Sequence, residues 1–241
     1  MDNVISVVKR SNQRGGRMLS VADLLEAGTL DLDKAGWLIS RIEEGSSFLV
    51  GAKPGGAGKT TVMGALLVML PAGVRLYLTD RSAGGFSAEM SASNNSYAKK
   101  YIVSYEISPA FYEGYVWGKA LRDMFAKTEL GFRIAANLHA DTVEDAKYQI
   151  VTENRVPEYQ FNKCGIFVPI TLRGWNREIK RIFYFDKERD NRWKELNAER
   201  EVSEREAEIQ DFLKYCVKRD IRLIEEVRDE WLAWSSGRPP I

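Results

Sequence analysis

The sequence has little of several features that mark special classes of protein. It contains two cysteines, Cys164 and Cys216, which lie far apart and match no metal-binding spacing. We therefore expect free buried thiols, as in proteins of the reducing cytosol. The formal net charge is only +1, so no excess of one sign draws the chain toward nucleic acid or anionic lipid.

Long apolar runs are also missing. The longest, VMGALLVML, is too short to span a bilayer and stops at Pro71. The first residues show no signal peptide, so we expect a soluble cytoplasmic protein that can still dock at the inner face of a membrane. What is present, 44% apolar and 29% charged residues over 241 positions, is ordinary for a globular protein with a sizeable core.

Apolar runs alternate with helix-like segments along much of the chain. Strands are predicted at 46–51, 74–80, 99–108 and 132–141, and helices at 58–70, 112–130 and 142–150. Strands that alternate with helices predict an α/β fold with a mainly parallel sheet covered on both faces. The Ser-, Gly- and Asn-rich segment 81–96 is expected to be a mobile loop.

The segments before and after this alternating region have other sequence patterns. Helices are predicted at 21–28 and at 31–45, the second capped by Asp31 or Asp33 and ended by Gly45. A β-hairpin is predicted around GWNRE, and the charged chain from Lys187 onward is expected to be helical, with Ser203 as a cap. We divide the chain into a helical lead-in (1–45), an α/β core (46–186) and a helical appendage (187–241).

The strongest chemical signal is the segment VGAKPGGAGKTT at 50–61. A strand, a glycine-rich loop and a helix form the context of a phosphate-binding P-loop, the Walker A motif. Backbone N–H groups and the helix N-terminus would bind phosphates, Lys59 would reach the β- and γ-phosphates, and Thr60 would ligate Mg²⁺. The predicted nucleotide-binding residues are Lys53, Gly55, Gly56, Ala57, Gly58, Lys59, Thr60 and Thr61.

Lys53 stands where the usual pattern has its first glycine. A lysine near this loop is typical of the cell-division and plasmid-partition ATPases, but there it directly precedes the two glycines, whereas Pro54 intervenes here. The alternative, which we favour, is an exposed lysine at the mouth of the loop, with Gly51 supplying some of the missing flexibility.

Three further residues are candidates for chemistry. Asp80 and Glu106 each lie at the end of a predicted strand, where ligands of open α/β sheets bind. Either carboxylate can hold Mg²⁺ or polarise water, or it can simply cap the following turn. The single histidine, His139, also follows a strand and taken alone is most simply a structural, hydrogen-bonded residue.

In this order, the motifs resemble the motor domain of the secretion-superfamily ATPases, the hexameric engines of type II and type IV secretion, type IV pili and the archaellum. Asp80 matches the aspartate of the family's aspartate box, with Thr79 in place of its glutamate. YIVSYEI resembles the Walker B strand, where Glu106 matches the glutamate and Tyr105 replaces a glycine. ANLHADTVEDA resembles the histidine box around His139, and FLKYCVKRDIRLIEEVRDE resembles the tail of the archaeal members.

The resemblance implies a RecA-like fold in which another strand separates the P-loop strand from the Glu106 strand. It implies a motor domain without the family's large N-terminal domain and with a shortened span between Asp80 and Glu106, which normally carries arginines that reach a neighbouring subunit. Glu106 would position or polarise the attacking water, Asp80 would act near Mg²⁺ or that water, and His139 would sense the γ-phosphate.

These observations predict an ATP- and Mg²⁺-dependent motor ATPase. The resemblance implies a homo-oligomeric ring, with six subunits in the family, and a membrane-embedded secretion or pilus platform as its partner. Two alternatives stay open: a nucleotide-binding regulatory or assembly subunit with little hydrolysis, and a dimeric switch ATPase of the partition type. A nucleic-acid packaging motor is disfavoured by the near-zero net charge.

Overall fold

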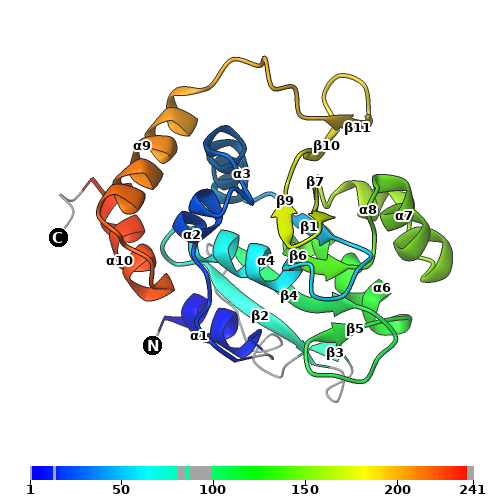
Figure 1. Ribbon diagram of the computed structural model, residues 1–241. Coiled ribbons are helices and arrows are strands. Elements are labelled where there is room, and N and C mark those ends of the chain that lie inside the picture. The colour runs from blue at the N-terminus through cyan, green and yellow to red at the C-terminus, as the bar shows by residue number, and fades with distance from the viewer. Residues whose placement is uncertain (1, 13–14, 81–84, 87–98, 238–241) are drawn as a thin grey trace.

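The computed structural model describes residues 2–12, 15–80, 85–86 and 99–237. Within these residues a sheet crosses the molecule in the order β11-β10-β7-β1-β6-β4-β2-β3, with β5 paired to β4 (Figure 1). The strands are β1 (Phe48–Gly51), β2 (Arg75–Asp80), β3 (Gly85–Phe86), β4 (Lys100–Ile107), β5 (Tyr115–Val116), β6 (Arg133–Leu138), β7 (Ile166–Pro169), β10 (Phe183–Asp186) and β11 (Arg192–Glu195). The central strands from β7 to β2 are parallel. The predicted α/β fold with a mainly parallel sheet is confirmed.

Helices cover both faces of this sheet, as Figure 1 shows. One apolar cluster joins the sheet to α1 (Asn3–Arg10), α2 (Val21–Glu26), α3 (Leu32–Glu44), α4 (Lys59–Val68), α9 (Glu204–Lys218) and α10 (Ile224–Ser235). A second joins the other face to α6 (Lys119–Ala126), α7 (Val143–Lys147) and α8 (Glu158–Asn162). Alternate side chains of a strand point to opposite faces, so Phe48 and Val50 belong to the first cluster and Leu49 to the second.

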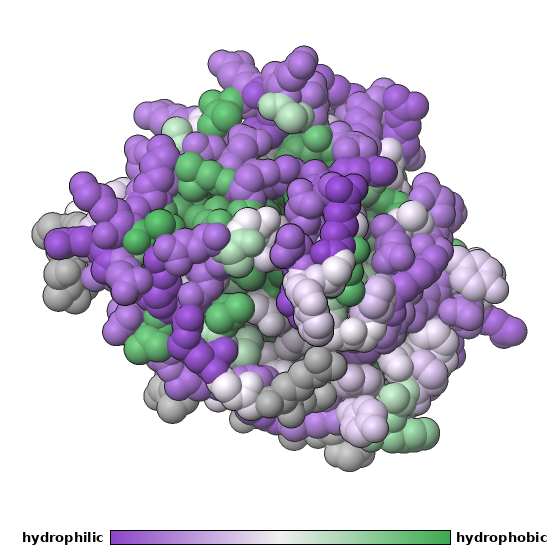
Figure 2. Space-filling view, in the orientation of Figure 1, coloured by the Kyte–Doolittle hydropathy of each residue, from purple (hydrophilic) through white to green (hydrophobic). Residues whose placement is uncertain are grey.

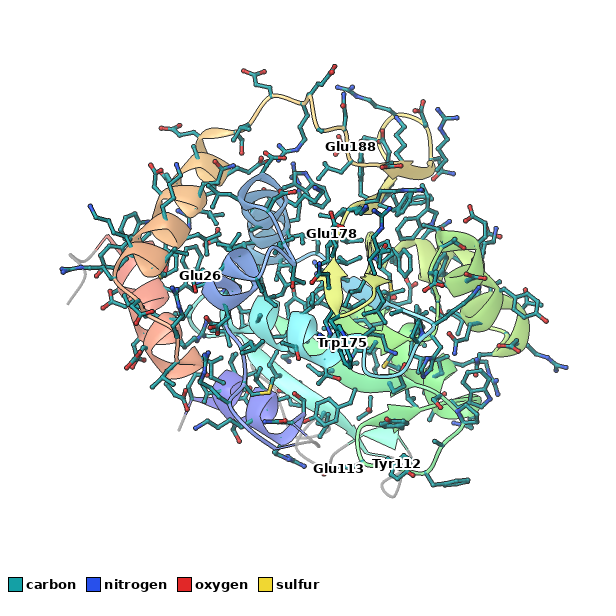
Figure 3. The ribbon with its side chains drawn as sticks, viewed as in Figure 1. Glu26, Tyr112, Glu113, Trp175, Glu178 and Glu188 are labelled. Atoms are coloured by element: carbon teal, nitrogen blue, oxygen red, sulfur yellow. The ribbon has the colours of Figure 1, made fainter. Side chains whose placement is uncertain are left out.

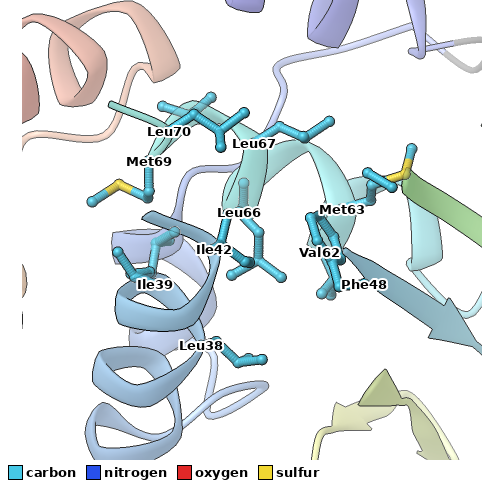
Figure 4. Close-up of a cluster of buried hydrophobic side chains, with 14 of the residues drawn as sticks. Leu38, Ile39, Ile42, Phe48, Val62, Met63, Leu66, Leu67, Met69 and Leu70 are labelled. Carbon is cyan, nitrogen blue, oxygen red and sulfur yellow. The ribbon is translucent and has the colours of Figure 1, made fainter. Parts of the chain in front are cut away.

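Helix α4, which follows the glycine loop, is buried on all sides. Val62 lies toward Phe48 of β1 and Leu66 toward Ile42 of α3, whereas Leu67 points to another side of the helix and is buried as well, as Figure 4 shows. A helix that is apolar all round belongs in the core of a protein. The start of this helix, where the glycine loop ends, is therefore held in place by packing.

Several local predictions are confirmed. Asp31 caps α3 by accepting a hydrogen bond from the Lys34 N–H, and Gly45 ends it in the left-handed conformation with φ of 101°. Ser203 caps α9 in the same way as Asp31 caps α3. The expected strand order is also found, because β6 lies between β1 and β4.

The helix predicted at 112–130 is wrong in its first third. Residues Tyr115–Val116 instead form β5, beside the end of β4, and α6 begins only at Lys119. Gly114 and Gly118 have positive φ angles of 76° and 60°, which an α-helix does not contain. Gly114 thus interrupts the predicted helix before β5, and Gly118 lies between β5 and the observed start of α6.

Some elements of the structure were not predicted. Helix α1, the short helix α8 and strand β11 are present, and β11 shows that the charged chain after Lys187 is not helical throughout. The loop predicted at 81–96 lies largely outside the described residues, although its Gly85–Phe86 pairs with the end of β2. The predicted hairpin is present as β8 (Thr171–Arg173) and β9 (Asn176–Glu178), which form a separate two-stranded sheet.

The C-terminal helices pack against the rest of the protein on the α4 side of the sheet. Buried residues of α9 and α10 belong to the same apolar cluster as α4. Figure 2 shows a largely hydrophilic surface with small apolar patches, as is usual for a folded domain. Among the described residues, none of the helices has both the length and the apolar character needed to cross a membrane.

Candidate functional site

The glycine loop joins β1 to α4 in the conformation that its sequence predicts. Gly56 and Gly58 have φ angles of 79° and 91°, in the left-handed region that favours glycine. Gly58 is also the N-cap of α4 and supplies no side-chain hydrogen bond. The first N–H groups of this helix are therefore free of a side-chain cap and can bind an anion.

Lys59 begins α4 with its side chain turned toward the interior. The residue is 6% exposed, and its ammonium donates a hydrogen bond to the Ala52 carbonyl at 3.2 Å. Its Nζ atom also lies 3.5 Å from Oε2 of Glu106. Burial of a charge is costly unless it is paired, so the Glu106 carboxylate is what allows this cation to remain beneath the loop.

Glu106 lies near the end of β4 and is 7% exposed. Within the described part of the chain, its Oε1 atom has no hydrogen-bond partner. Burial raises the pKa of this carboxyl, and the nearby Lys59 and His139 side chains lower it by less. A buried carboxylate oxygen that accepts no hydrogen bond can accept a proton from water or bind a cation.

His139, just beyond β6, comes to the same place. Its Nδ1 atom lies 3.0 Å from the Lys53 carbonyl oxygen and 3.5 Å from Nζ of Lys59. The other nitrogen, Nε2, lies 3.8 Å from Oε1 of Glu106. His139 thus lies between the loop backbone and the Glu106 carboxylate. The residues around His139 in the sequence did not by themselves indicate this position.

A cavity of about 700 Å³ opens over these groups. Its floor is the glycine loop and the first turn of α4, together with Glu106 and His139. One wall comes from the N-terminal segment, including Arg17 and Met18, and another from the tip of the β8–β9 hairpin. Segments far apart in the sequence therefore enclose one pocket above the loop.

Lys53 turns away from this pocket. Its N–H donates to Oδ1 of Asp141 at 2.8 Å, and its ammonium pairs with Asp145 at 2.9 Å. That pairing raises the pKa of the exposed Lys53 side chain. This geometry agrees with the interpretation of Lys53 as an exposed lysine at the mouth of the loop. The role of Lys53 in nucleotide binding stays a prediction.

Gly51 serves the loop through its small size. A Cβ atom there would lie 2.3 Å from the Ala140 carbonyl oxygen and 2.6 Å from the Phe167 ring. Its φ angle lies outside the left-handed region, so the flexibility that we expected from Gly51 is not what the position requires. Close approach of β1 to its neighbours is the physical reason for glycine here.

The aspartate-box positions are only partly described. Thr79 is buried, and its hydroxyl has no hydrogen-bond partner among the described residues. Asp80 is the last residue of β2, but its side chain lies outside the described part of the structure. Its predicted roles near Mg²⁺ or the attacking water therefore stay predictions.

Two residues at this site were missed by the sequence reasoning. Asn137 of β6 is fully buried, and its amide donates to the Tyr105 carbonyl at 2.8 Å and to the Thr60 hydroxyl at 3.3 Å. An amide inside the apolar run FRIAANL was the available signal, because buried polar groups need partners. Arg177 of β9 reaches the loop as well, and its place in a short exposed hairpin offered no comparable signal.

No protein-family model and no curated protein matches this chain. Among solved structures, the VirB11 ATPase of the Brucella suis type IV secretion system, in complex with sulphate, is 19% identical with a TM-score of 0.46 over 67% of this chain. The Legionella pneumophila ATPase DotB is 11% identical with a TM-score of 0.40 over 87% of this chain. The matches span 53% and 62% of those two proteins.

Proposed function

We propose that this chain binds ATP with Mg²⁺ at the 55–61 loop and hydrolyses it. The observation that carries the proposal is the buried ion pair of Lys59 and Glu106, with 3.5 Å between Nζ and Oε2, at the floor of the cavity that the loop lines. A buried cation beside free helix N–H groups suits a polyphosphate. A buried carboxylate with a raised pKa suits a group that takes a proton from water.

Each residue would have a distinct part in the reaction. The Lys59 ammonium would leave the Ala52 carbonyl and bind phosphate oxygens, where charge develops during phosphoryl transfer. Glu106 would orient the attacking water and accept its proton. His139, held through Nδ1 by the Lys53 carbonyl, would transmit the state of the phosphates from Glu106 to the loop backbone.

The same cavity has the oxygen donors that Mg²⁺ prefers. The Thr60 side chain lines it, and so does Glu106 with its unpartnered Oε1 atom. Mg²⁺ is commonly held by one or two protein oxygens together with substrate phosphates. Thr60 would hold the ion, with Asp80 as the predicted second ligand, and the ion would neutralise charge on the phosphates.

The motor role is the further part of the proposal. It rests on the order of motifs around Lys59, Asp80, Glu106 and His139, which resembles the secretion-superfamily ATPases and most of all their archaeal members. In this role the chain would form a homo-oligomeric ring at the cytoplasmic face of a membrane. ATP turnover would move subunits against each other and drive a secretion or pilus-type assembly.

The test is ATP binding and steady-state hydrolysis by the purified chain with Mg²⁺, beside Lys59→Ala, with light scattering to size each sample. We expect Mg²⁺-dependent hydrolysis that falls by about 10²-fold or more in Lys59→Ala, the usual cost of removing a group that stabilises transition-state charge. We also expect ATP to promote a ring. An unmodified chain that does not bind ATP would refute the proposal.

A second candidate, a nucleotide-binding subunit with little hydrolysis, is favoured by Thr79. This residue stands where the resembled family has a glutamate, and its buried hydroxyl supplies no carboxylate. The comparison of the unmodified chain with Glu106→Gln separates the two functions. Tight ATP binding with equal background turnover in both proteins would identify the regulatory subunit.

A further inference from the structure

The β8–β9 hairpin has a fixed base and an exposed tip. The N–H of Ile170, just before β8, donates to the Gly51 carbonyl at 2.8 Å, and the N–H of Ile179, just after β9, donates to the Thr29 carbonyl at 2.8 Å. Both isoleucine side chains are buried. The hairpin is therefore anchored at one end to the strand that leads into the glycine loop and at the other to the N-terminal wall of the cavity.

The tip of this hairpin lies beside the phosphate-binding loop. Gly174 has φ of 60°, as the first position of a two-residue type II′ turn requires. Trp175 follows it and is 93% exposed, and Figure 3 shows it at the hairpin turn, next to the start of α4. Trp175, Asn176 and Arg177 all line the cavity above the loop.

Arg177 crosses the loop itself. Its Nη2 atom donates to the Gly56 carbonyl at 3.2 Å, and its Cδ atom lies 3.2 Å from where a Cβ on Gly58 would be. Its other described hydrogen bond goes from Nη1 to the Trp175 carbonyl at 3.4 Å. The guanidinium is thus placed over the two left-handed glycines of the loop.

Arg177 carries an exposed positive charge beside the loop. Among the residues that the structure describes, no carboxylate forms an ion pair with it, and the neighbouring Glu178 pairs with Lys180 at 3.4 Å instead. A guanidinium binds phosphate through two parallel hydrogen bonds in which both partners are charged, whereas the Gly56 carbonyl is a neutral acceptor that takes a single hydrogen bond from Arg177. A phosphate chain in the loop would therefore displace the Gly56 carbonyl as the partner of Arg177.

We propose that Arg177 is a phosphate-binding residue of this site, contributed by the β8–β9 hairpin of the same chain. The inference rests on the nucleotide site proposed above. It assigns to the β8–β9 hairpin the recognition of a nucleoside polyphosphate from the side opposite Lys59. It also supplies, within one chain, an arginine that contacts the bound phosphates.

The experiment is calorimetric titration of ATP and ADP, with Mg²⁺, into the unmodified chain, Arg177→Gln and Arg177→Lys. Arg173→Gln is the matched control, because it removes the same charge from an exposed position of the same hairpin that does not line the cavity. We expect Arg177→Gln to bind ATP about tenfold more weakly, the usual effect of losing one hydrogen bond between charged groups. Arg177→Lys should lie between, and Arg173→Gln should bind like the unmodified chain.

The outcomes separate this inference from the proposed function. If the unmodified chain binds no ATP, the nucleotide site itself is refuted, and Arg177 has no phosphate to bind. If the unmodified chain binds ATP and Arg177→Gln binds equally well, the inference alone is wrong. An equal loss in Arg173→Gln and Arg177→Gln would also overturn it, because the effect would then come from the general charge of the hairpin.

Discussion

Tyr105 ties the strand of the candidate catalytic carboxylate to the N-terminal helix. From β4, its hydroxyl donates a hydrogen bond to the Val7 carbonyl in α1 at 2.9 Å. The Tyr105 ring packs against Gly114, where a Cβ atom would lie only 2.3 Å from the ring. The resembled family has a glycine at the position of Tyr105. The larger side chain thus gives α1 a buried anchor one residue away from Glu106.

Loss of this anchor should weaken the fold. In Tyr105→Phe, the buried Val7 carbonyl loses one of its donors, which should lower the free energy of unfolding by about 1 kcal/mol. Urea denaturation measures the change. Tyr112→Phe is the control, because Tyr112 is 63% exposed and its change should stay within about 0.5 kcal/mol. Equal stability of Tyr105→Phe and the unmodified chain would show that the anchor contributes nothing.

The raised pKa of Glu106 predicts the pH dependence of ATP hydrolysis. Only the ionised carboxylate accepts a proton from water, so activity should rise as the pH passes upward through the pKa of Glu106. Because burial raises that pKa, the rise should lie above the range of an exposed glutamate, about 4.3. A pH–rate profile measures it. Glu106→Gln should remove the rise and lower the rate about 10²-fold or more, and a rise that persists in the variant would assign it to another group.

Gly51 should tolerate no side chain. In Gly51→Ala, the new methyl group would overlap the Ala140 carbonyl and the Phe167 ring, so we expect a loss of about 1–3 kcal/mol in the free energy of unfolding. Gly55→Ala is the matched control in the same loop, because a Cβ there meets nothing within 4 Å. Thermal unfolding of both variants decides the matter, and equal melting temperatures would contradict the steric argument.

Arg228 should matter for stability through the C-terminal end of α4. Its buried guanidinium donates to the Val68 carbonyl at 2.9 Å and to the Leu70 carbonyl, and its Nε atom lies 3.2 Å from the Asp2 carboxylate. Arg228→Met should cost about 2–3 kcal/mol, because buried acceptors would lose their donor. Chemical denaturation beside Arg219→Met, an exposed arginine of the tail, provides the comparison. Similar losses of stability in both variants would refute the role of Arg228 at the C-terminal end of α4.

The sequence predicts local structure correctly where neighbouring residues decide it. Asp31 and Gly45 determine where α3 begins and ends, because caps depend on local hydrogen bonds and local φ angles. The glycines of 55–58 between an apolar run and a helix likewise predict the loop from local chemistry alone. The helix predicted at 112–130 is only partly correct. The apolar residues do recur with helical spacing, but the helix begins after Gly118.

By itself, the sequence determined the strand, loop and helix around Lys59, the alternation that makes a parallel sheet, and the helix caps. Only the tertiary structure decided which distant residues meet that loop. The strand order places β6 between β1 and β4, which brings Asn137 and His139 beside Thr60 and Glu106. The hairpin anchors likewise bring Arg177 over Gly56. These contacts depend on register and packing between segments far apart in the chain, which no local pattern of residues specifies.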